Sequence, residues 1–246
     1  MTHFPYDSLD ADEARIGLIV LSADESLERD LRDLMPLRVN LLTSRVPSGD
    51  EVTEETLGAM AEALPAAARL LPQARRFDAV GYGCTSGAAV IGRARVAALV
   101  GGAVPARAVT DPVTALTAAC AALGLRRIAI LSPYVAAVSD RLRAALLSEG
   151  IETPLFGTFD EAAEEKVVRI APHSIIAAGR ALMAEGGAEA LFLSCTNLRT
   201  LGVIAPLEQA LGLPVLSSNT VLAWHMLRLA GIADRRPDLG TLFAAH

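Results

Sequence analysis

The strongest constraint on the fold is an internal repeat. Residues 19–31 (IVLSADESLERDL) align with residues 129–142 (AILSPYVAAVSDRL), so that Ser22 falls on Ser132 at an offset of 110 residues. A second landmark further along each half, a Cys-Thr pair, recurs at an offset of 111 residues. Such a nearly constant offset predicts two similar units related by an approximate two-fold axis, with a ligand site in the crevice between them.

Within each half, short apolar runs alternate with amphipathic stretches. Apolar residues make up 52% of the chain and aromatic residues only 4%, which is typical of Ala-rich helices on buried strands. The alternation predicts an α/β fold of two pseudo-two-fold-related domains with parallel sheets and right-handed crossovers. The expected strands are 16–22, 38–46, 77–84, 104–110, 126–132, 151–159, 188–195 and 213–218. The expected helices include 23–35, 53–71, 85–100, 133–150 and 200–212, with Thr53 as an N-cap and Pro65 as a kink or break.

Two of these strands end at the Cys-Thr pairs. FDAVGYGC ends at Cys84 and AEALFLSC ends at Cys195, and each is expected to lead into a helix. A strand that stops at a nucleophile places it at the carboxyl edge of a parallel sheet, where α/β proteins bind ligands. Because the repeat gives both cysteines the same topological position, we expect the two thiols to face each other across one small-molecule site.

Opposed thiols suit proton exchange at carbon. One cysteine, as a thiolate, removes a proton, and the other, as a thiol, delivers one to the opposite face. The same pair would allow one thiolate to add to an activated double bond while the other thiol acts as an acid. A helix N-terminus after each cysteine is expected to lower the thiol pKa.

Polar side chains beside the cysteines are candidates for substrate binding. Hydroxyl and amide groups directly after each cysteine offer donors to a carboxylate or enolate oxygen. Tyr134 follows a strand end and is the repeat counterpart of Asp24, so that its hydroxyl is expected to face the crevice. The candidate substrate-binding residues are Ser22, Asp24, Thr85, Ser86, Tyr134, Thr196 and Asn197.

Other reactive residue types have simpler explanations. Cys120, within TALTAACAALG, is expected to be a small core side chain. The carboxylates Glu161, Glu164 and Glu165 are expected to form a solvated helix face.

Charge and spacing exclude several functional classes. The net charge of -6 argues against a nucleic-acid surface. The cysteines and histidines show no metal-ligand spacing, so we expect no metal site. The N-terminus is polar and acidic rather than a signal peptide, and no apolar run approaches the ~20 residues of a membrane span. We therefore expect a cytoplasmic protein with no membrane or nucleic-acid partner.

The sequence resembles the aspartate/glutamate racemase superfamily and, within it, the branch of maleate cis-trans isomerases and arylmalonate decarboxylases. The elements that carry the resemblance are GLIVLS, YGCTSG, LSPY, FLSCTNLR and LPVLSSN, spread over nearly the whole chain. Within this branch it is most similar to the ectoine-utilisation protein A group, through LSADESLERD, SRVPSGDEVTEETL, GYGCTSGAAVIG and AWHMLRLAG.

This resemblance implies cofactor-independent catalysis at a domain interface and a homo-oligomer, often a dimer. It implies a first domain of residues 1–110 plus 215–246 and a second domain of residues 111–214. The two cysteines that maleate isomerases use correspond to Cys84, the nucleophile, and Cys195, and their aromatic hydroxyl corresponds to Tyr134. Arylmalonate decarboxylases lack the first cysteine, so the presence of Cys84 speaks against that activity.

The chain departs from the maleate isomerase pattern at two positions. Those enzymes carry Asn where this chain has Asp24, and a second Asn where it has the acidic run 161–165. Carboxylates there should repel a dicarboxylate such as maleate, and we expect Asp24 to pair with a cationic nitrogen instead. The expected partner is therefore a small carboxylate or amino-acid-like substrate. The sequence thus predicts a racemase or isomerase acting at the carbon next to a carboxylate, with a place in ectoine catabolism. The alternatives are a maleate cis-trans isomerase, a decarboxylase of a malonate-like acid, and a non-catalytic ligand-binding member.

Overall fold

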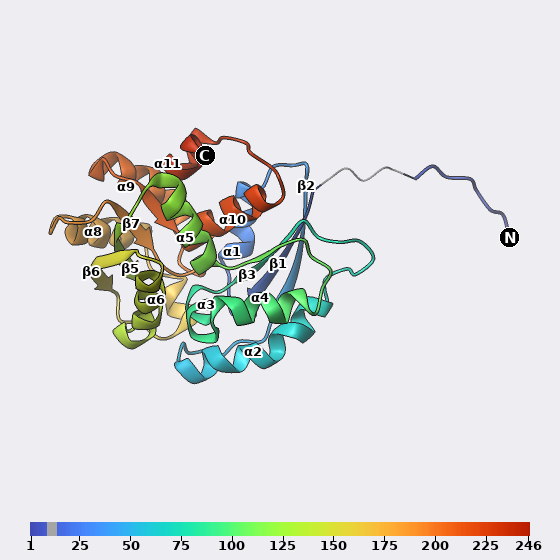
Figure 1. The fold of residues 1–246 in the computed structure, drawn as a ribbon, viewed down its shortest axis with the longest axis horizontal. Coiled ribbons are helices and arrows are strands. Elements are labelled where there is room, and N and C mark those ends of the chain that lie inside the picture. Colours follow the sequence, from blue (N-terminus) through green and yellow to red (C-terminus); the bar gives the residue numbers. More distant parts are fainter. Residues whose placement is uncertain (9–13) are drawn as a thin grey trace.

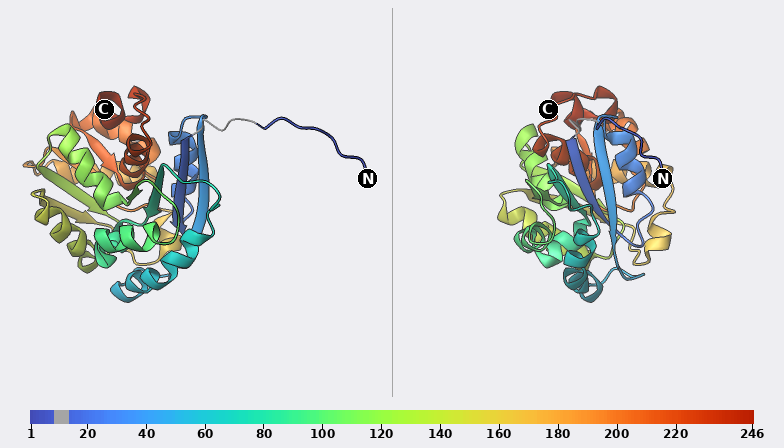
Figure 2. Two further views of the ribbon diagram at one scale, coloured as in Figure 1. Left: turned by 45° about the vertical axis from the view of Figure 1, so that its right-hand side comes forward. Right: turned by 90° about the vertical axis from the view of Figure 1, so that its right-hand side faces the viewer.

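The computed structural model describes residues 1–8 and 14–246, which form two four-stranded parallel sheets with helices packed around them (Figure 1). The two sheets stand apart in space, with the blue strands of the first well separated from the strands of the second (Figure 2, left). Residues 1–8 are exposed and extend away from the body of the molecule. In the described part of the chain, no helix has the length and apolar character of a membrane span.

The first sheet has the strand order β2-β1-β3-β4. Its central strand β1 is buried at every position after Ala14 and pairs in parallel with β2 on one side and β3 on the other. Burial on both faces explains why this strand is a continuous apolar run from Ile16 to its end. The strands are β1 Ala14–Leu21, β2 Val39–Val46, β3 Ala79–Gly83 and β4 Val109–Thr110.

The second sheet repeats the order of the first, as β6-β5-β7-β8. Its strands are β5 Arg127–Ser132, β6 Glu152–Thr158, β7 Ala190–Leu193 and β8 Val215–Ser217. The same order in both halves confirms the predicted α/β architecture and the repeat. The domain boundaries stay a prediction; β8 pairs with β7 in the second sheet, whereas the helix after it packs against β3 and β4 of the first.

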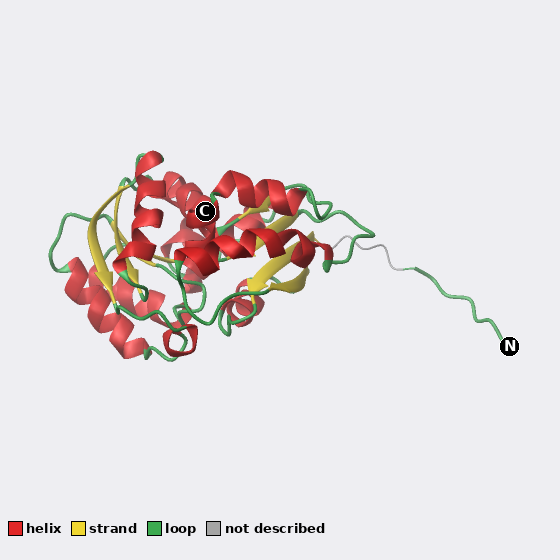
Figure 3. Ribbon diagram, turned by 90° about the horizontal axis from the view of Figure 1, so that it is seen from below, coloured by secondary structure: helices red, strands yellow, loops and turns green. Residues whose placement is uncertain are grey.

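Helices lie around and between the two groups of strands (Figure 3). The α-helices are α1 Leu27–Leu34, α2 Glu54–Arg69, α3 Thr85–Ile91, α4 Arg93–Gly101, α5 Pro112–Leu123, α6 Ala136–Ser148, α7 Glu164–Val167, α8 Pro172–Met183, α9 Ile204–Leu211, α10 Ser218–Leu229 and α11 Thr241–Ala245. Short 3-10 turns occur at Leu201–Val203 and Pro237–Leu239. Cys120 is buried in α5, in agreement with its predicted role as a core side chain.

Several predicted boundaries were wrong for identifiable reasons. The stretch 85–100 is two helices, because Gly92 adopts φ 91° between α3 and α4. The α2 helix runs unbroken through Pro65 to Arg69, while Thr53 caps it as predicted and shares a reciprocal capping box with Thr56. The expected strand 104–110 pairs regularly only over Val109–Thr110.

Candidate active site

Cys84 lies where β3 ends and α3 begins. It is the N-cap of α3, and its Sγ accepts a hydrogen bond from the backbone N–H of Gly87 at 3.1 Å. A Cβ at Gly87 would lie 2.9 Å from this sulfur and 2.4 Å from the hydroxyl oxygen of Tyr82. The close approach of backbone to thiol therefore requires glycine at position 87.

Cys195 lies just beyond β7, at the equivalent position of the second sheet. Its φ of 147° is unusual for a residue with a side chain and costs about 1–3 kcal/mol. Two contacts hold this conformation: the backbone N–H of Cys195 donates to Ser218 Oγ at 3.0 Å, and its Sγ accepts from the backbone N–H of Asn197 at 3.3 Å. The expected helix 200–212 forms as a 3-10 turn at Leu201–Val203 followed by α9, whereas the helix N-terminus expected at Cys195 itself was wrong.

The two cysteines line the same small cavity. Its volume is about 10 Å³, the space of about one water molecule. The cavity lies between the carboxyl ends of the two sheets and is lined by Leu21, Val52, Leu57, Cys84, Thr85, Ser86, Tyr134, Glu164, Cys195 and Thr196. The structure thus brings together both cysteines and four of the seven predicted substrate-binding residues.

A hydrogen-bonded network surrounds Cys195. The hydroxyl of Tyr134 lies 2.9 Å from Cys195 Sγ and donates to Glu164 Oε1 at 2.8 Å. Asn197 Nδ2 donates to the other carboxylate oxygen of Glu164, also at 2.8 Å. Tyr134, Glu164 and Asn197 are all buried, so this network fixes the orientation of the phenol against the thiol.

The prediction that Glu164 lies on a solvated helix face was wrong. Its exposure is 5%, because the backbone at the start of the four-residue helix α7 pairs with the loop before α2. The backbone N–H of Glu164 donates to Asp50 O, and that of Val52 donates to Ala162 O. Helical periodicity carries no information over the four residues of α7. The one hint in the sequence was the resemblance to maleate isomerases, which implies a polar amide at the position of the acidic run 161–165.

Three predicted residues lie outside the cavity lining. Ser22 is exposed, and its hydroxyl bonds Ser48 Oγ at 3.0 Å. Asp24 is buried beside the lining, where Oδ1 accepts from two backbone N–H groups of the α1 N-terminus. Asn197 supports the lining from behind, since its Oδ1 also accepts from the backbone N–H of Glu25.

Ser218, which the sequence reasoning missed, links the two cysteine segments. Its hydroxyl oxygen accepts from Thr85 Oγ1 at 2.7 Å and from the backbone N–H of Cys195 at 3.0 Å. Thr196 makes a second link through Oγ1, which donates to Gly83 O at 3.3 Å. The signal for Ser218 was its place at the end of the β8 run LPVLSS, which reaches the same sheet edge.

Burial dominates the electrostatics of the site. It raises the pKa of Cys84 to about 12, against the lowering effect of the Gly87 N–H, and it raises the pKa of Cys195 with a further contribution from the charge of Glu164. Burial also raises the pKa of Asp24 and of Glu164. The lowered thiol pKa expected from a helix N-terminus is therefore wrong for this structure, because desolvation outweighs the backbone donors.

The described residues contain no cluster of three or more side chains suited to binding a metal ion. The groups gathered at the cavity are thiols, hydroxyls and a carboxyl. Such a set can remove and deliver protons and can add sulfur to an activated double bond.

Comparisons with known proteins agree with this architecture. Arylmalonate decarboxylase of Bordetella bronchiseptica is 34% identical over 132 residues, which is 53% of this chain, so the match spans about half (55%) of that enzyme's length. Maleate isomerase of Geobacillus stearothermophilus is 25% identical over 94% of this chain and 97% of its own.

Solved structures show the same fold. A cysteine-to-serine mutant of Nocardia farcinica maleate cis-trans isomerase, with a covalently bound succinylcysteine intermediate, matches with a TM-score of 0.82 at 25% identity, over 95% of this chain and 99% of its own. A liganded double mutant of arylmalonate decarboxylase matches with a TM-score of 0.80 at 26% identity, over 94% and 98%.

The family assignment rests on nearly the whole chain. The sequence model described as arylmalonate decarboxylase matches residues 16–243, a range that includes both sheets and both cysteines. The predicted resemblance to this branch of the racemase superfamily is thereby confirmed, whereas the ectoine-utilisation subgroup stays a prediction. The chain belongs to the arylmalonate decarboxylase family.

Proposed function

We propose that this protein is a cofactor-independent racemase or isomerase that moves a proton at the carbon next to a substrate carboxylate. The observation that carries the proposal is that Cys84 and Cys195, from equivalent positions in two sheets, line one cavity. In the reaction, one thiolate removes the proton from carbon and the other thiol delivers a proton to the opposite face.

The surrounding groups suit such a proton transfer. The phenol of Tyr134 orients Cys195, and the hydroxyl of Ser86 lies in the lining, where it can donate to the substrate carboxylate as negative charge develops on it. A thiol of raised pKa is rarely ionised at neutral pH, but its thiolate is a stronger base toward a weakly acidic carbon.

Maleate cis-trans isomerisation is a second candidate. It is supported by the similarity to maleate isomerases, one of which carries a succinylcysteine intermediate. In that reaction a cysteine adds to the double bond, and Cys84 would have this role here. The buried carboxyls of Asp24 and Glu164 weigh against a dicarboxylate in this site.

Decarboxylation of a malonate-like acid, supported by the family, would need only one proton donor, Cys195, and leaves Cys84 without a role. A non-catalytic member would bind the ligand without turnover. From the sequence resemblance we also propose a role in ectoine catabolism and a homodimer or higher oligomer. A cytoplasmic location completes the proposal.

Hydrogen exchange in D₂O tests the proposal. We expect the wild type to incorporate deuterium at the carbon next to the carboxylate of a substrate and to interconvert its stereoisomers. Cys84→Ala and Cys195→Ala should each abolish interconversion, because either face then lacks its acid or base. Cys120→Ala, in the core of α5, is the matched control and should retain it.

Three results would contradict the two-thiol mechanism. If Cys84→Ala still releases CO₂ from a malonate-like acid, the protein is a decarboxylase. If the wild type converts maleate to fumarate but incorporates no deuterium into saturated acids, the second candidate holds. Binding without any exchange or turnover would indicate a non-catalytic member.

A further inference from the structure

A second, larger cavity adjoins the one between the cysteines. Its volume is about 530 Å³, and Glu164 lines both cavities. We call it the acidic vestibule; its lining consists of Ala23, Glu25, Asp50, Glu51, Ala163, Glu164 and Glu165, of which five are carboxylates. A ligand on its way to the thiols through this opening therefore passes a strongly negative surface.

Two loops from opposite domains hold the vestibule in place. Glu51 and Ala163 form an antiparallel bridge, with Val52 N–H donating to Ala162 O at 3.1 Å and Glu164 N–H to Asp50 O at 3.2 Å. The backbone thus fixes the carboxylates next to one another across the domain boundary, despite their mutual repulsion.

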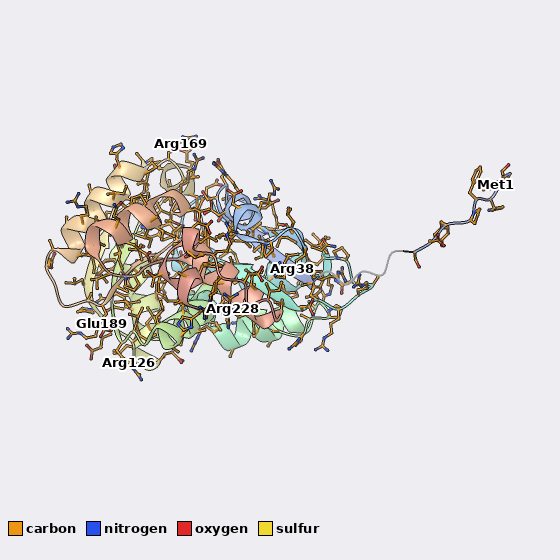
Figure 4. The ribbon with its side chains drawn as sticks, turned by 90° about the horizontal axis from the view of Figure 1, so that it is seen from above. Met1, Arg38, Arg126, Arg169, Glu189 and Arg228 are labelled. Carbon is orange, nitrogen blue, oxygen red and sulfur yellow. The ribbon has the colours of Figure 1, made fainter. Side chains whose placement is uncertain are left out.

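Few cations offset this charge. Within the described residues, one vestibule carboxylate forms an ion pair: Glu165 lies 3.9 Å from Arg169. Both of these side chains are at least 70% exposed, and Arg169 lies at the outer edge of the molecule (Figure 4). The carboxyl of Glu164, at the inner end, has only the neutral donors Tyr134 and Asn197.

Asp24 adds an independent observation inside the protein. Its exposure is 4%, and its Oδ2 is buried without a hydrogen-bond partner among the described residues. Its charge raises the pKa of Glu164 and of both thiols, and its two neighbours in the chain, Ala23 and Glu25, line the acidic vestibule. The charge of Arg45 lowers the pKa of this carboxyl, but the guanidinium donates to the backbone carbonyl of Asp24 and forms its ion pair with Glu28.

We propose that the substrate carries a protonated nitrogen on or next to the reacting carbon, and that Asp24 and Glu164 receive this nitrogen while the acidic vestibule attracts it. The inference rests on the proposed function in one respect, that the reacting carbon lies between the thiols. A dicarboxylate would instead add like charge beside two buried carboxyls, which costs several kcal/mol. An ammonium group supplies three donors and would satisfy the free Oδ2 of Asp24.

The ionisation of the two carboxyls is consistent with this assignment. Burial, more than any neighbour, raises the pKa of both Asp24 and Glu164. A bound cation offsets that cost and restores the charged form of the carboxyl it contacts.

A matched set of four-carbon acids tests the charge preference. The probes are 2-aminobutanoate, 3-aminobutanoate, butanoate and succinate, with binding measured by calorimetry. We expect either aminobutanoate to bind at least about tenfold more tightly than butanoate and succinate, which corresponds to 1.4 kcal/mol. Asp24→Asn or Glu164→Gln should reduce this ratio, and Glu185→Gln, an exposed carboxylate beyond α8, should leave it unchanged.

Charged thiol reagents give a second measurement on the wild-type protein. It does not depend on whether Asp24→Asn and Glu164→Gln fold. The cation 2-aminoethyl methanethiosulfonate should modify Cys84 or Cys195 at least about tenfold faster than the anion 2-sulfonatoethyl methanethiosulfonate, because clefts of one charge raise encounter rates by that order. The ratio should fall with added salt and in a Glu25→Gln/Glu51→Gln double variant, which changes only exposed side chains.

The outcomes separate this inference from the proposed function. Equal or tighter binding of succinate, a reagent ratio of one or below, or failure of the cationic reagent to reach either cysteine overturns the cationic substrate. Where none of the four acids binds, the reagent ratio decides. If the protein prefers cationic ligands but exchanges no hydrogen at carbon, the cationic substrate stands and the racemase proposal fails. If it exchanges hydrogen but prefers succinate, the racemase proposal stands and the cationic substrate fails.

Discussion

The hydroxyl of Tyr134 lies 2.9 Å from Sγ of Cys195 while it donates its proton to Glu164. The oxygen therefore faces the sulfur as an acceptor, and the thiol proton has a defined direction. Tyr134 and Cys195 lie just beyond two different strands of the second sheet, and Glu164 begins α7, whose backbone bonds Asp50 in the loop before α2. The orientation of one thiol thus depends on contacts between both halves of the molecule.

Removal of this hydroxyl should impair catalysis more than binding. In Tyr134→Phe, we expect kcat to fall by about 10²-fold with little change in KM, because the thiol loses its orientation. The lost partner of Glu164 should also lower the free energy of unfolding by about 1–3 kcal/mol. Steady-state kinetics and urea denaturation measure the two effects; an equal rise in KM at constant kcat would show that the phenol binds substrate rather than orients Cys195.

The raised thiol pKa predicts the pH dependence of the reaction. The pKa of Cys84 is about 12 because the side chain is desolvated, so the reactive thiolate fraction should grow about tenfold per pH unit throughout the neutral range. We expect log(kcat/KM) to rise with a slope near one from pH 6 to pH 9. A plateau beginning below pH 8 would contradict this. It would show that the pKa of the reacting thiol is far lower than the value that burial gives it.

Sequence patterns predicted the parts of this structure that depend on local chemistry and on the repeat. Apolar runs located the strands, and the constant offset placed Cys84 and Cys195 at equivalent strand ends, which the structure brings to one cavity. The hydroxyl of Tyr134 followed from the same offset, since a residue just beyond a strand end faces the crevice.

What the sequence did not predict depends on contacts between distant segments. Glu164 is buried because residues 162–164 pair with residues 50–52, more than 100 positions away, and no local pattern records that pairing. Ser22 also ends a strand, but its side chain turns outward to Ser48. A strand end specifies the sheet edge, but the loops around it decide which way each side chain points.

The close contact at Gly87 predicts a severe local effect of a small change. Gly87→Ala would place Cβ 2.9 Å from Cys84 Sγ and 2.4 Å from the Tyr82 oxygen, so the thiol must move. We expect loss of activity by at least 10²-fold and a loss of about 1–3 kcal/mol of stability from overpacking.

Gly58→Ala is the matched control for this substitution. Gly58 lies within α2 with no atom within 4 Å of its added Cβ. There the change should stabilise the protein by about 0.5–1 kcal/mol, since alanine is the better helix former, and activity should be unchanged. Equal activity losses in both variants would mean that helix rigidity, rather than the thiol position, limits the reaction.

Asp30 predicts how stability varies with pH. Burial raises its pKa from 3.8 to about 6, while Asn219 Nδ2 donates to Oδ2 at 2.8 Å. As pH rises from 4 to 6, the unfolded chain loses this proton before the folded protein does, so the free energy of unfolding should fall, by at most about 3 kcal/mol. Asp30→Asn retains an acceptor for Asn219 but cannot ionise, so the variant should be the more stable at pH 7 and lack this slope. Glu62→Gln, an exposed carboxylate on α2, is the control and should keep the wild-type slope. Urea denaturation across this pH range measures the slope, and a wild-type slope in Asp30→Asn would refute the assignment.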